Sequence, residues 1–125
     1  MPAKAGLTAE VSMAVTDADT AVALGSGSVA VLGTPRIVAL CEEATIKALA
    51  GRLEEGTTSV GSRIQLDHLH PTAVGHPVRA EARLARVEGR RLTFTVAVHD
   101  DRCLVAAGKV TRVVVETARF VERSS

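Results

Sequence analysis

The chain has 125 residues and a net charge of +1, from 15 basic and 14 acidic side chains. This balance, with only two aromatic residues, excludes the basic surface and the stacking platforms of most nucleic-acid-binding proteins. No apolar run approaches the roughly 20 residues of a membrane-spanning helix. The N-terminus lacks the features of a signal peptide. We therefore expect one domain, residues 1–125, located in the cytoplasm, with no nucleic-acid or membrane partner.

The cysteine and aromatic content limits both the cofactors that the chain could hold and the composition of its core. Cys41 and Cys103 are too few for a disulfide framework and have no metal-ligand spacing, so we expect no metal ion and no cofactor. Phe94 and Phe120 are the only aromatic residues, so the core must consist of Val, Leu, Ile and Ala. A chain of this length buries about two thirds of its surface on folding, which is enough for a stable core.

The first half of the chain predicts a strand, a loop and a long helix. Apolar residues alternate over residues 7–15, which indicates a strand with one buried face. Residues 16–33 contain Asp and Gly turn signals and predict an irregular lid, with a short helical piece at residues 20–24. Thr34 is a good N-cap and Pro35 a good first helical residue. The helix is expected to extend to about Leu53 and to stop before Gly56.

The second half of the chain predicts four strands, which follow the helix. From residue 57 onward, side chains of one parity form an inward face that ends at a histidine. The residues of this face are Val60, Ser62, Ile64, Leu66 and His68.

The remaining strands follow from alternation and turn signals. Residues 78–87 and 92–99 are expected to form a hairpin. A turn at residues 100–102 leads into residues 103–121, which are expected to form either one long final strand or a strand with a bulge near Gly108. One long helix against one mostly antiparallel sheet is an α+β arrangement.

Two charged or titratable residues interrupt the apolar faces. Glu42 lies at the edge of the buried arc of the helix, whereas Glu43 lies about 100° further round and should be solvated. Glu42 is either a functional carboxylate or a side chain that reaches solvent or an arginine. His68 lies at the inward end of its strand. It could meet Glu42 and act as a base or orient a water, or it could be a structural histidine.

Thr34 also has two interpretations. Its hydroxyl can cap the helix, which alone would explain the residue. Because helix N-termini attract anions, the hydroxyl could instead face a ligand, and the amides of the first turn could stabilise an oxyanion.

Several segments together resemble the fluoroacetyl-CoA thioesterase-like family of hotdog proteins. The matching segments are Gly33-Thr34-Pro35 with Glu42, Val60-Gly61-Ser62, His68 to Gly75, Val87 to Leu92, and Gly108 to Arg112. Each motif is modest, but their order and spacing together are specific. The resemblance covers the chain from about Leu7 to Phe120.

This resemblance implies a hotdog fold, in which an antiparallel sheet wraps around one long central helix. It implies a homodimer or a higher oligomer, with active sites at the subunit interface. By position, Thr34, Glu42 and His68 match the family's catalytic residues. Gly61 matches a glycine that lines the site, and Arg112 an arginine near it.

The implied function is hydrolysis of an acyl-CoA thioester to a free acid and CoA. The fluoroacetyl-specific enzyme recognises its substrate with an aromatic lid, and this chain has no aromatic residue before Phe94. We therefore expect thioesterase chemistry without that selectivity. The alternatives are an acyl-CoA or acyl-carrier binding module without hydrolysis, and a structural dimerisation domain. A hotdog hydratase is disfavoured, because Asp67-His68 lies at a strand end.

Overall fold

The computed structural model describes residues 3–125, so Met1 and Pro2 of the predicted domain lie outside the described residues. Its five strands form one antiparallel sheet in the order β1-β3-β4-β5-β2. They are β1 (Thr8–Ala14), β2 (Thr57–His68), β3 (Pro77–Glu88), β4 (Arg91–His99) and β5 (Leu104–Glu116). The helices are η1 (Asp17–Asp19), α1 (Ala21–Leu24), α2 (Thr34–Ala48) and α3 (Thr117–Arg123).

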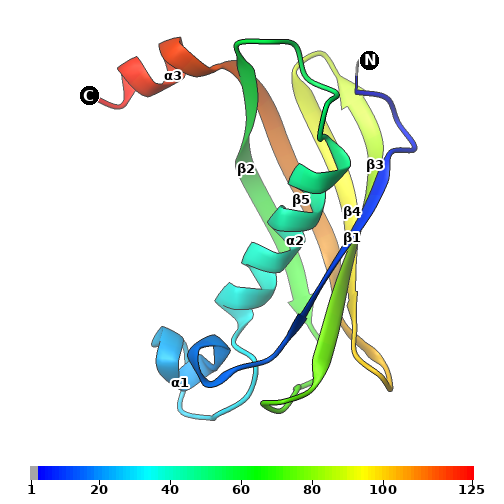
Figure 1. The fold of residues 1–125 in the computed structure, drawn as a ribbon, viewed down its shortest axis with the longest axis vertical. Coiled ribbons are helices and arrows are strands. Elements are labelled where there is room, and N and C mark those ends of the chain that lie inside the picture. The colour runs from blue at the N-terminus through cyan, green and yellow to red at the C-terminus, as the bar shows by residue number, and fades with distance from the viewer. Residues whose placement is uncertain (1–2) are drawn as a thin grey trace.

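The sheet curves around α2, which crosses its concave face (Figure 1). The buried residues of α2 recur at helical spacing, and they pack mainly on β1 and β3. These residues are Ile37, Leu40, Cys41, Ala44, Thr45 and Ala48. From the sheet, Phe94 of β4 is the largest fully buried side chain. The predicted α+β arrangement and the solvated Glu43 are confirmed. The core is mainly aliphatic, as predicted, but it also contains Phe94 and Cys41.

The lid between β1 and α2 is ordered by polar contacts. Asp19 accepts hydrogen bonds from the Thr16 amide and hydroxyl, both at 2.8 Å, and from Arg36 Nε at 3.2 Å. The Thr16 amide is the main reason why the pKa of Asp19 is lowered, and the Arg36 charge lowers it further. The short helical piece predicted at residues 20–24 is confirmed as α1.

Helix α2 differs from the prediction at both ends. It begins at Thr34, with Gly33 as N-cap, and no side chain caps it. It ends at Ala48 rather than near Leu53. After Ala48 the backbone amides bond to the carbonyl three residues back, which tightens the chain, and Gly51 then adopts a positive φ of 72°.

The predicted final strand is too long. β5 ends at Glu116, which pairs with Thr57, the first residue of β2. The Thr117 amide still donates to the Gly56 carbonyl oxygen at 3.0 Å, and the backbone that follows bonds locally and forms α3. The predicted bulge at Gly108 is also wrong, because Gly108 pairs regularly with Leu66 and Val96. A Cβ at this glycine would overlap the Gln65 carbonyl oxygen, so close strand approach explains the residue.

The irregularity in β2 lies at Ser62 instead. The register with β5 shifts between Gly61 and Arg63, which leaves Ser62 as an extra residue. A bulge reverses the side-chain alternation, so Gly61 faces the helix and Val60 points away from it. The predicted inward face is therefore correct for Ile64, Leu66 and His68 and wrong for Val60.

Candidate active site

The backbone at the start of α2 leaves the Thr34 hydroxyl free. The amides of Arg36 and Ile37 both donate to the Gly33 carbonyl oxygen, at 3.0 and 3.2 Å. An N-cap hydroxyl at Thr34 would bond amides of that turn, and they are already occupied. Gly33 can cap here because it packs against α1, where a Cβ would come within 2.9 Å of a Leu24 methyl carbon.

The free hydroxyl meets His68 at the end of β2. Thr34 Oγ1 lies 2.8 Å from His68 Nδ1, a short hydrogen bond between residues 34 positions apart. The other ring nitrogen, Nε2, is buried and has no hydrogen-bond partner within residues 3–125. A buried polar atom without a partner costs stability, so its presence favours a functional role over a structural one.

Glu42 lies two turns further along α2 and contacts Arg112 rather than His68. Its carboxylate oxygen Oε2 accepts from Arg112 Nη1 at 3.2 Å, and its side chain is 34% exposed. Arg112 is buried and also donates to Ser59, from Nε to the hydroxyl at 2.8 Å and from Nη2 to the carbonyl at 2.9 Å. Burial lowers the pKa of Arg112, and the nearby Glu42 carboxylate opposes that shift.

Gly61 provides the space that this carboxylate occupies. An added Cβ would overlap Glu42 Oε2 and would lie 3.8 Å from Arg112 Nη1. Gly61 also pairs with Arg112 across the β2–β5 ladder, so both residues lie on the same face of the sheet. A side chain here would displace Glu42, which explains the glycine.

The structure therefore shows two polar groups along α2, one at its start and one near its middle. Thr34 and His68 form the first group, and Glu42, Gly61 and Arg112 the second. Eight residues of α-helix separate Thr34 from Glu42, which is about 12 Å along the axis. The expected contact between Glu42 and His68 is not present within the chain.

A family model described as "Fluoroacetyl-CoA-specific thioesterase", FlK, matches residues 15–118 of the chain. The chain belongs to the FlK family. The fluoroacetyl-CoA thioesterase of Streptantibioticus cattleyicolor is 37% identical over 90 residues, which are 72% of this chain and 65% of that protein. The matched region is thus slightly less than two thirds of that relative's length.

Solved structures give the same family and the fold. A phenylalanine-to-alanine variant of FlK, in complex with fluoroacetate and CoA, is 31% identical, with a TM-score of 0.88 over 94% of this chain and 99% of that chain. A hot-dog-like protein from Thermanaerovibrio acidaminovorans is 28% identical, with a TM-score of 0.89 over 96% of this chain and 89% of that chain. The hotdog fold expected from the sequence is confirmed.

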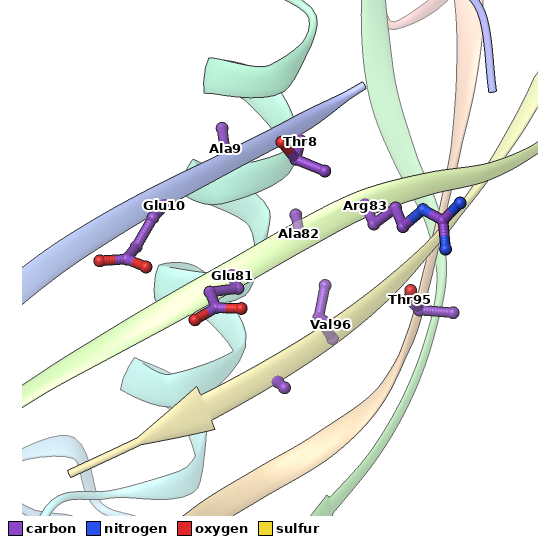
Figure 2. A pocket seen from close by; sticks show the side chains of 9 residues that line it. Thr8, Ala9, Glu10, Glu81, Ala82, Arg83, Thr95 and Val96 are labelled. Atoms are coloured by element: carbon purple, nitrogen blue, oxygen red, sulfur yellow. The ribbon is translucent and has the colours of Figure 1, made fainter. Parts of the chain in front are cut away.

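A surface hollow of about 510 Å³ in this FlK-family chain lies away from both polar groups. It is a shallow depression on the outer face of β1, β3 and β4, and side chains such as Glu10, Glu81 and Arg83 line it (Figure 2). A smaller hollow of about 270 Å³ adjoins Arg112 and Ser59 at the end of α2. Only the smaller one touches residues of the candidate site.

Other features limit what this chain can use for catalysis. Burial raises the pKa of the Cys41 thiol to about 12, and the neighbouring Glu42 charge raises it further, so this thiol is a poor nucleophile at neutral pH. No helix within residues 3–125 has both the length and the apolar character needed to cross a membrane.

Ser59 is a residue that the sequence did not single out. It positions the Arg112 guanidinium with its hydroxyl and its carbonyl oxygen. Extending the predicted alternation of this strand would place Ser59 on the outer face, because the bulge at Ser62 has no clear local signal.

Proposed function

We propose that this FlK-family chain is an acyl-CoA thioesterase that hydrolyses an acyl-CoA thioester to a free acid and CoA. We assign Thr34, Glu42 and His68 as catalytic residues, and Gly61 and Arg112 as residues that shape the substrate site. The observation that carries the proposal is the Thr34–His68 hydrogen bond, with a buried imidazole nitrogen left without a partner. Family membership supports the type of reaction, and FlK has been solved with CoA.

Hydrolysis of a thioester requires a deprotonated nucleophile, a stabilised oxyanion and a proton for the departing thiolate. If water attacks, its proton passes to Glu42 or His68, the tetrahedral intermediate collapses, the C–S bond breaks, and the CoA sulfur receives the proton. If Thr34 attacks instead, His68 Nδ1 accepts the hydroxyl proton, the C–S bond breaks and the CoA sulfur receives that proton, and water later cleaves the acyl ester. Rapid-quench mass spectrometry distinguishes the routes, because only the second adds the acyl mass to the protein.

The donors for the oxyanion are fewer than the sequence suggested. Pro35 has no N–H, and the amides of Arg36 and Ile37 are occupied by the Gly33 carbonyl. The Thr34 amide is therefore the donor that the first turn retains, and His68 Nε2 can supply a second when it carries the proton.

We further propose that a second copy of the chain completes the active site. The two polar groups lie too far apart within one chain for Glu42 to assist Thr34 and His68 directly. β2 is an edge strand of 12 residues, and its flanks carry exposed apolar side chains such as Ile64 and Leu69. A long edge of this kind is a template for pairing with another strand. Glu42 of the partner subunit would then approach Thr34 and His68.

The acyl group is proposed to be other than fluoroacetyl. The ordered lid, η1 and α1 with their connections, contains only small and aliphatic apolar side chains, and Val22, Leu24 and Val29 are exposed. An aliphatic lid makes apolar contact with an acyl chain but has no aromatic ring to contact a fluorine.

We also propose that residues 1–125 form a single domain, because the described residues share one core cluster.

The first experiment assays the purified protein against short and medium acyl-CoAs, with fluoroacetyl-CoA included and a Glu42→Ala variant as control. We expect release of free CoA at a rate at least about 100-fold above the control on one or more substrates. CoA binding without release above the control would instead support a non-hydrolytic binding module. If the protein neither binds CoA nor releases it from any acyl-CoA, the structural dimerisation domain is the remaining alternative.

The second experiment tests the shared site. Co-expression of differently tagged His68→Gln and Glu42→Gln chains gives a heterodimer that contains one intact site and one doubly altered site. We expect this heterodimer to show about half the wild-type rate, although each parent homodimer is nearly inactive. If the heterodimer is as inactive as its parents, each site is built from one chain.

A further inference from the structure

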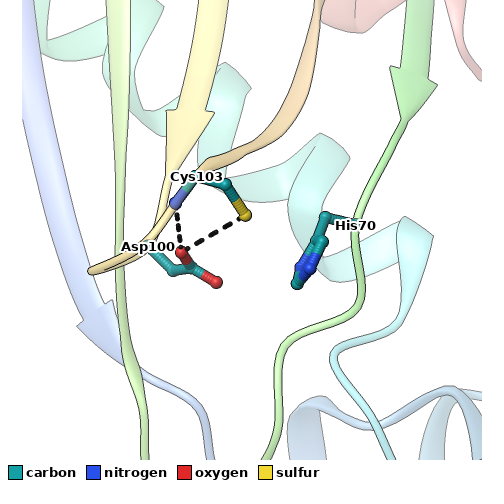
Figure 3. A group of neighbouring side chains, drawn as sticks. All are labelled: His70, Asp100 and Cys103. Carbon is teal, nitrogen blue, oxygen red and sulfur yellow. Dashed lines mark hydrogen bonds between the residues drawn. The ribbon is translucent and has the colours of Figure 1, made fainter.

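A second cluster of reactive side chains lies outside the candidate active site. His70 follows β2, Asp100 follows β4, and Cys103 immediately precedes β5. Figure 3 shows the three side chains converging from these two loops. One candidate ligand atom from each residue lies within 4.8 Å of those of the other two. We propose that His70, Asp100 and Cys103 form a binding site for a divalent transition-metal ion, with Zn²⁺ as the best fit.

The donor set matches this type of ion. Imidazole nitrogen, carboxylate oxygen and thiolate sulfur are the three protein ligands of Zn²⁺, at about 2.0–2.3 Å. Two ligands on a tetrahedral ion at those lengths are about 3.4–3.8 Å apart. Asp100 Oδ1 and Cys103 Sγ already have this separation, at 3.7 Å. Since the ligand atoms lie within 4.8 Å of one another, a rotation of the exposed His70 side chain that moves a ring nitrogen by about 1 Å reaches the same spacing.

The imidazole of His70 has the tautomer that metal binding requires. Its Nδ1 lies 2.8 Å from the Pro71 carbonyl oxygen. A carbonyl only accepts, so Nδ1 carries the proton, and the lone pair of the neutral ring is on Nε2. Metal-binding histidines commonly donate their second nitrogen to a backbone carbonyl, which fixes the ring and increases its basicity.

The backbone fixes the distance between the two loops. The amides of Leu69 and His70 donate to the Val105 carbonyl oxygen at 2.8 and 3.3 Å, which extends the β2–β5 ladder up to the cluster. Asp100 Oδ1 accepts from the amides of Arg102 and Cys103 at 2.8 and 2.9 Å, which holds its carboxylate in place. The other carboxylate oxygen of Asp100 points toward the His70 ring (Figure 3).

A hollow beside the cluster leaves room for the ion's remaining ligand, although Cys103 does not line it. This hollow of about 150 Å³ is lined by His70 and Asp100, and also by His76. With three protein ligands, the fourth tetrahedral position is left for a water molecule. On binding, Cys103 exchanges its thiol proton for the metal, the proton goes to solvent, and no oxidant or reductant is required.

The bound ion would connect the loop after β2 to the β4–β5 turn. His70 and Asp100 are 30 positions apart in the sequence, so only the pairing of β2 with β5 brings them together. This explains why the sequence predicted no metal site. The site is separate from Thr34, Glu42 and His68, so metal binding can be tested without reference to thioester hydrolysis.

The test uses untagged, chelator-treated protein titrated with Zn²⁺ by calorimetry and with Co²⁺ by absorption spectroscopy. We expect one ion per chain and a thiolate-to-Co²⁺ charge-transfer band. The variants are His70→Gln, Asp100→Asn and Cys103→Ser, each checked for fold by circular dichroism. Each should weaken Zn²⁺ binding at least about tenfold, since loss of even an outer partner costs that much. The band should disappear in Cys103→Ser, although Cys41 is retained.

Asp101→Asn is the matched control, because it removes the same charge from the same turn without removing a proposed ligand. It should bind Zn²⁺ as the wild type does. Absence of stoichiometric Zn²⁺ binding would overturn the proposal. So would equal affinity in all four variants, or a Co²⁺ spectrum without the thiolate band.

Discussion

Gly61→Ala tests how Glu42 is positioned. The methyl group would overlap Glu42 Oε2, so the carboxylate must move away from its place between β2 and Arg112. The Glu42 side chain is already 34% exposed and can rotate into solvent, whereas Arg112 keeps its two bonds to Ser59. We therefore expect the fold to survive and the geometry of the carboxylate to be lost.

The two effects of this substitution differ in size. Loss of the Arg112–Glu42 bond costs about 1.5–3 kcal/mol at most, and alanine in place of glycine in a strand returns about 0.5–1 kcal/mol. The free energy of unfolding should fall by about 0.5–2.5 kcal/mol. A catalytic carboxylate displaced by about 1 Å or more costs about 100-fold in rate, which is about 2.7 kcal/mol in the transition state.

The assay combines kcat/KM on the best acyl-CoA substrate with denaturant unfolding, for the wild type, Gly61→Ala, Glu42→Gln and the double variant. If Gly61 acts only by making room for Glu42, the second substitution should add nothing to the first. Ser62→Ala is the neighbouring control, since its exposed hydroxyl only donates to the Thr111 carbonyl at 3.3 Å. Wild-type kcat/KM in Gly61→Ala, or an equal loss in the Glu42→Gln background, would refute the reasoning.

Three further predictions concern the start of α2, the lid and the thiols. Thr34→Val should reduce kcat at least about tenfold, because it removes the hydroxyl bonded to His68, whereas Thr34→Ser should retain most of it; similar rates for both variants would contradict this. The pKa of Asp19 is lower in the folded chain, so its stabilising contribution is present above the unfolded value near 3.8 and is lost as pH falls through the folded pKa. Asp19→Asn should therefore lower the free energy of unfolding by about 1 kcal/mol at pH 7 and flatten its decline below pH 4, and an unchanged acid limb in pH-dependent unfolding would argue against this. A thiol reagent at pH 8 should label Cys103 in the folded protein, more slowly than a free thiol, and should reach Cys41 only after unfolding, because burial raises the pKa of Cys41 to about 12. Labelling of both thiols at the same rate would show that α2 opens readily.

Local sequence patterns were sufficient to predict many of the elements of this protein and several of their faces. The alternation of residues 7–15, the hairpin of residues 78–87 and 92–99 and the solvated Glu43 were each predicted correctly, since each depends on a few neighbouring residues. Glu42 was placed correctly at the edge of the buried arc, because helical periodicity needs no knowledge of what the helix packs against. The α+β arrangement followed from the order of the elements.

Tertiary structure decided where the polar groups meet. Thr34 was predicted as an N-cap, but packing of Gly33 against α1 moved the cap by one residue and freed the hydroxyl for His68. The bulge at Ser62 turned Gly61 toward Glu42, and it depends on the register of β2 against β5. Long-range pairing of this kind sets register, and register sets the face of every side chain that follows.

The sequence by itself thus determined the elements and most of their buried faces, because hydrophobic periodicity and turn chemistry act over a few residues. Only the tertiary structure decided that Glu42 pairs with Arg112, 70 positions away, and that His70 converges with Asp100 and Cys103. Contacts such as these depend on strand order and register, which the whole sheet sets when it closes around α2.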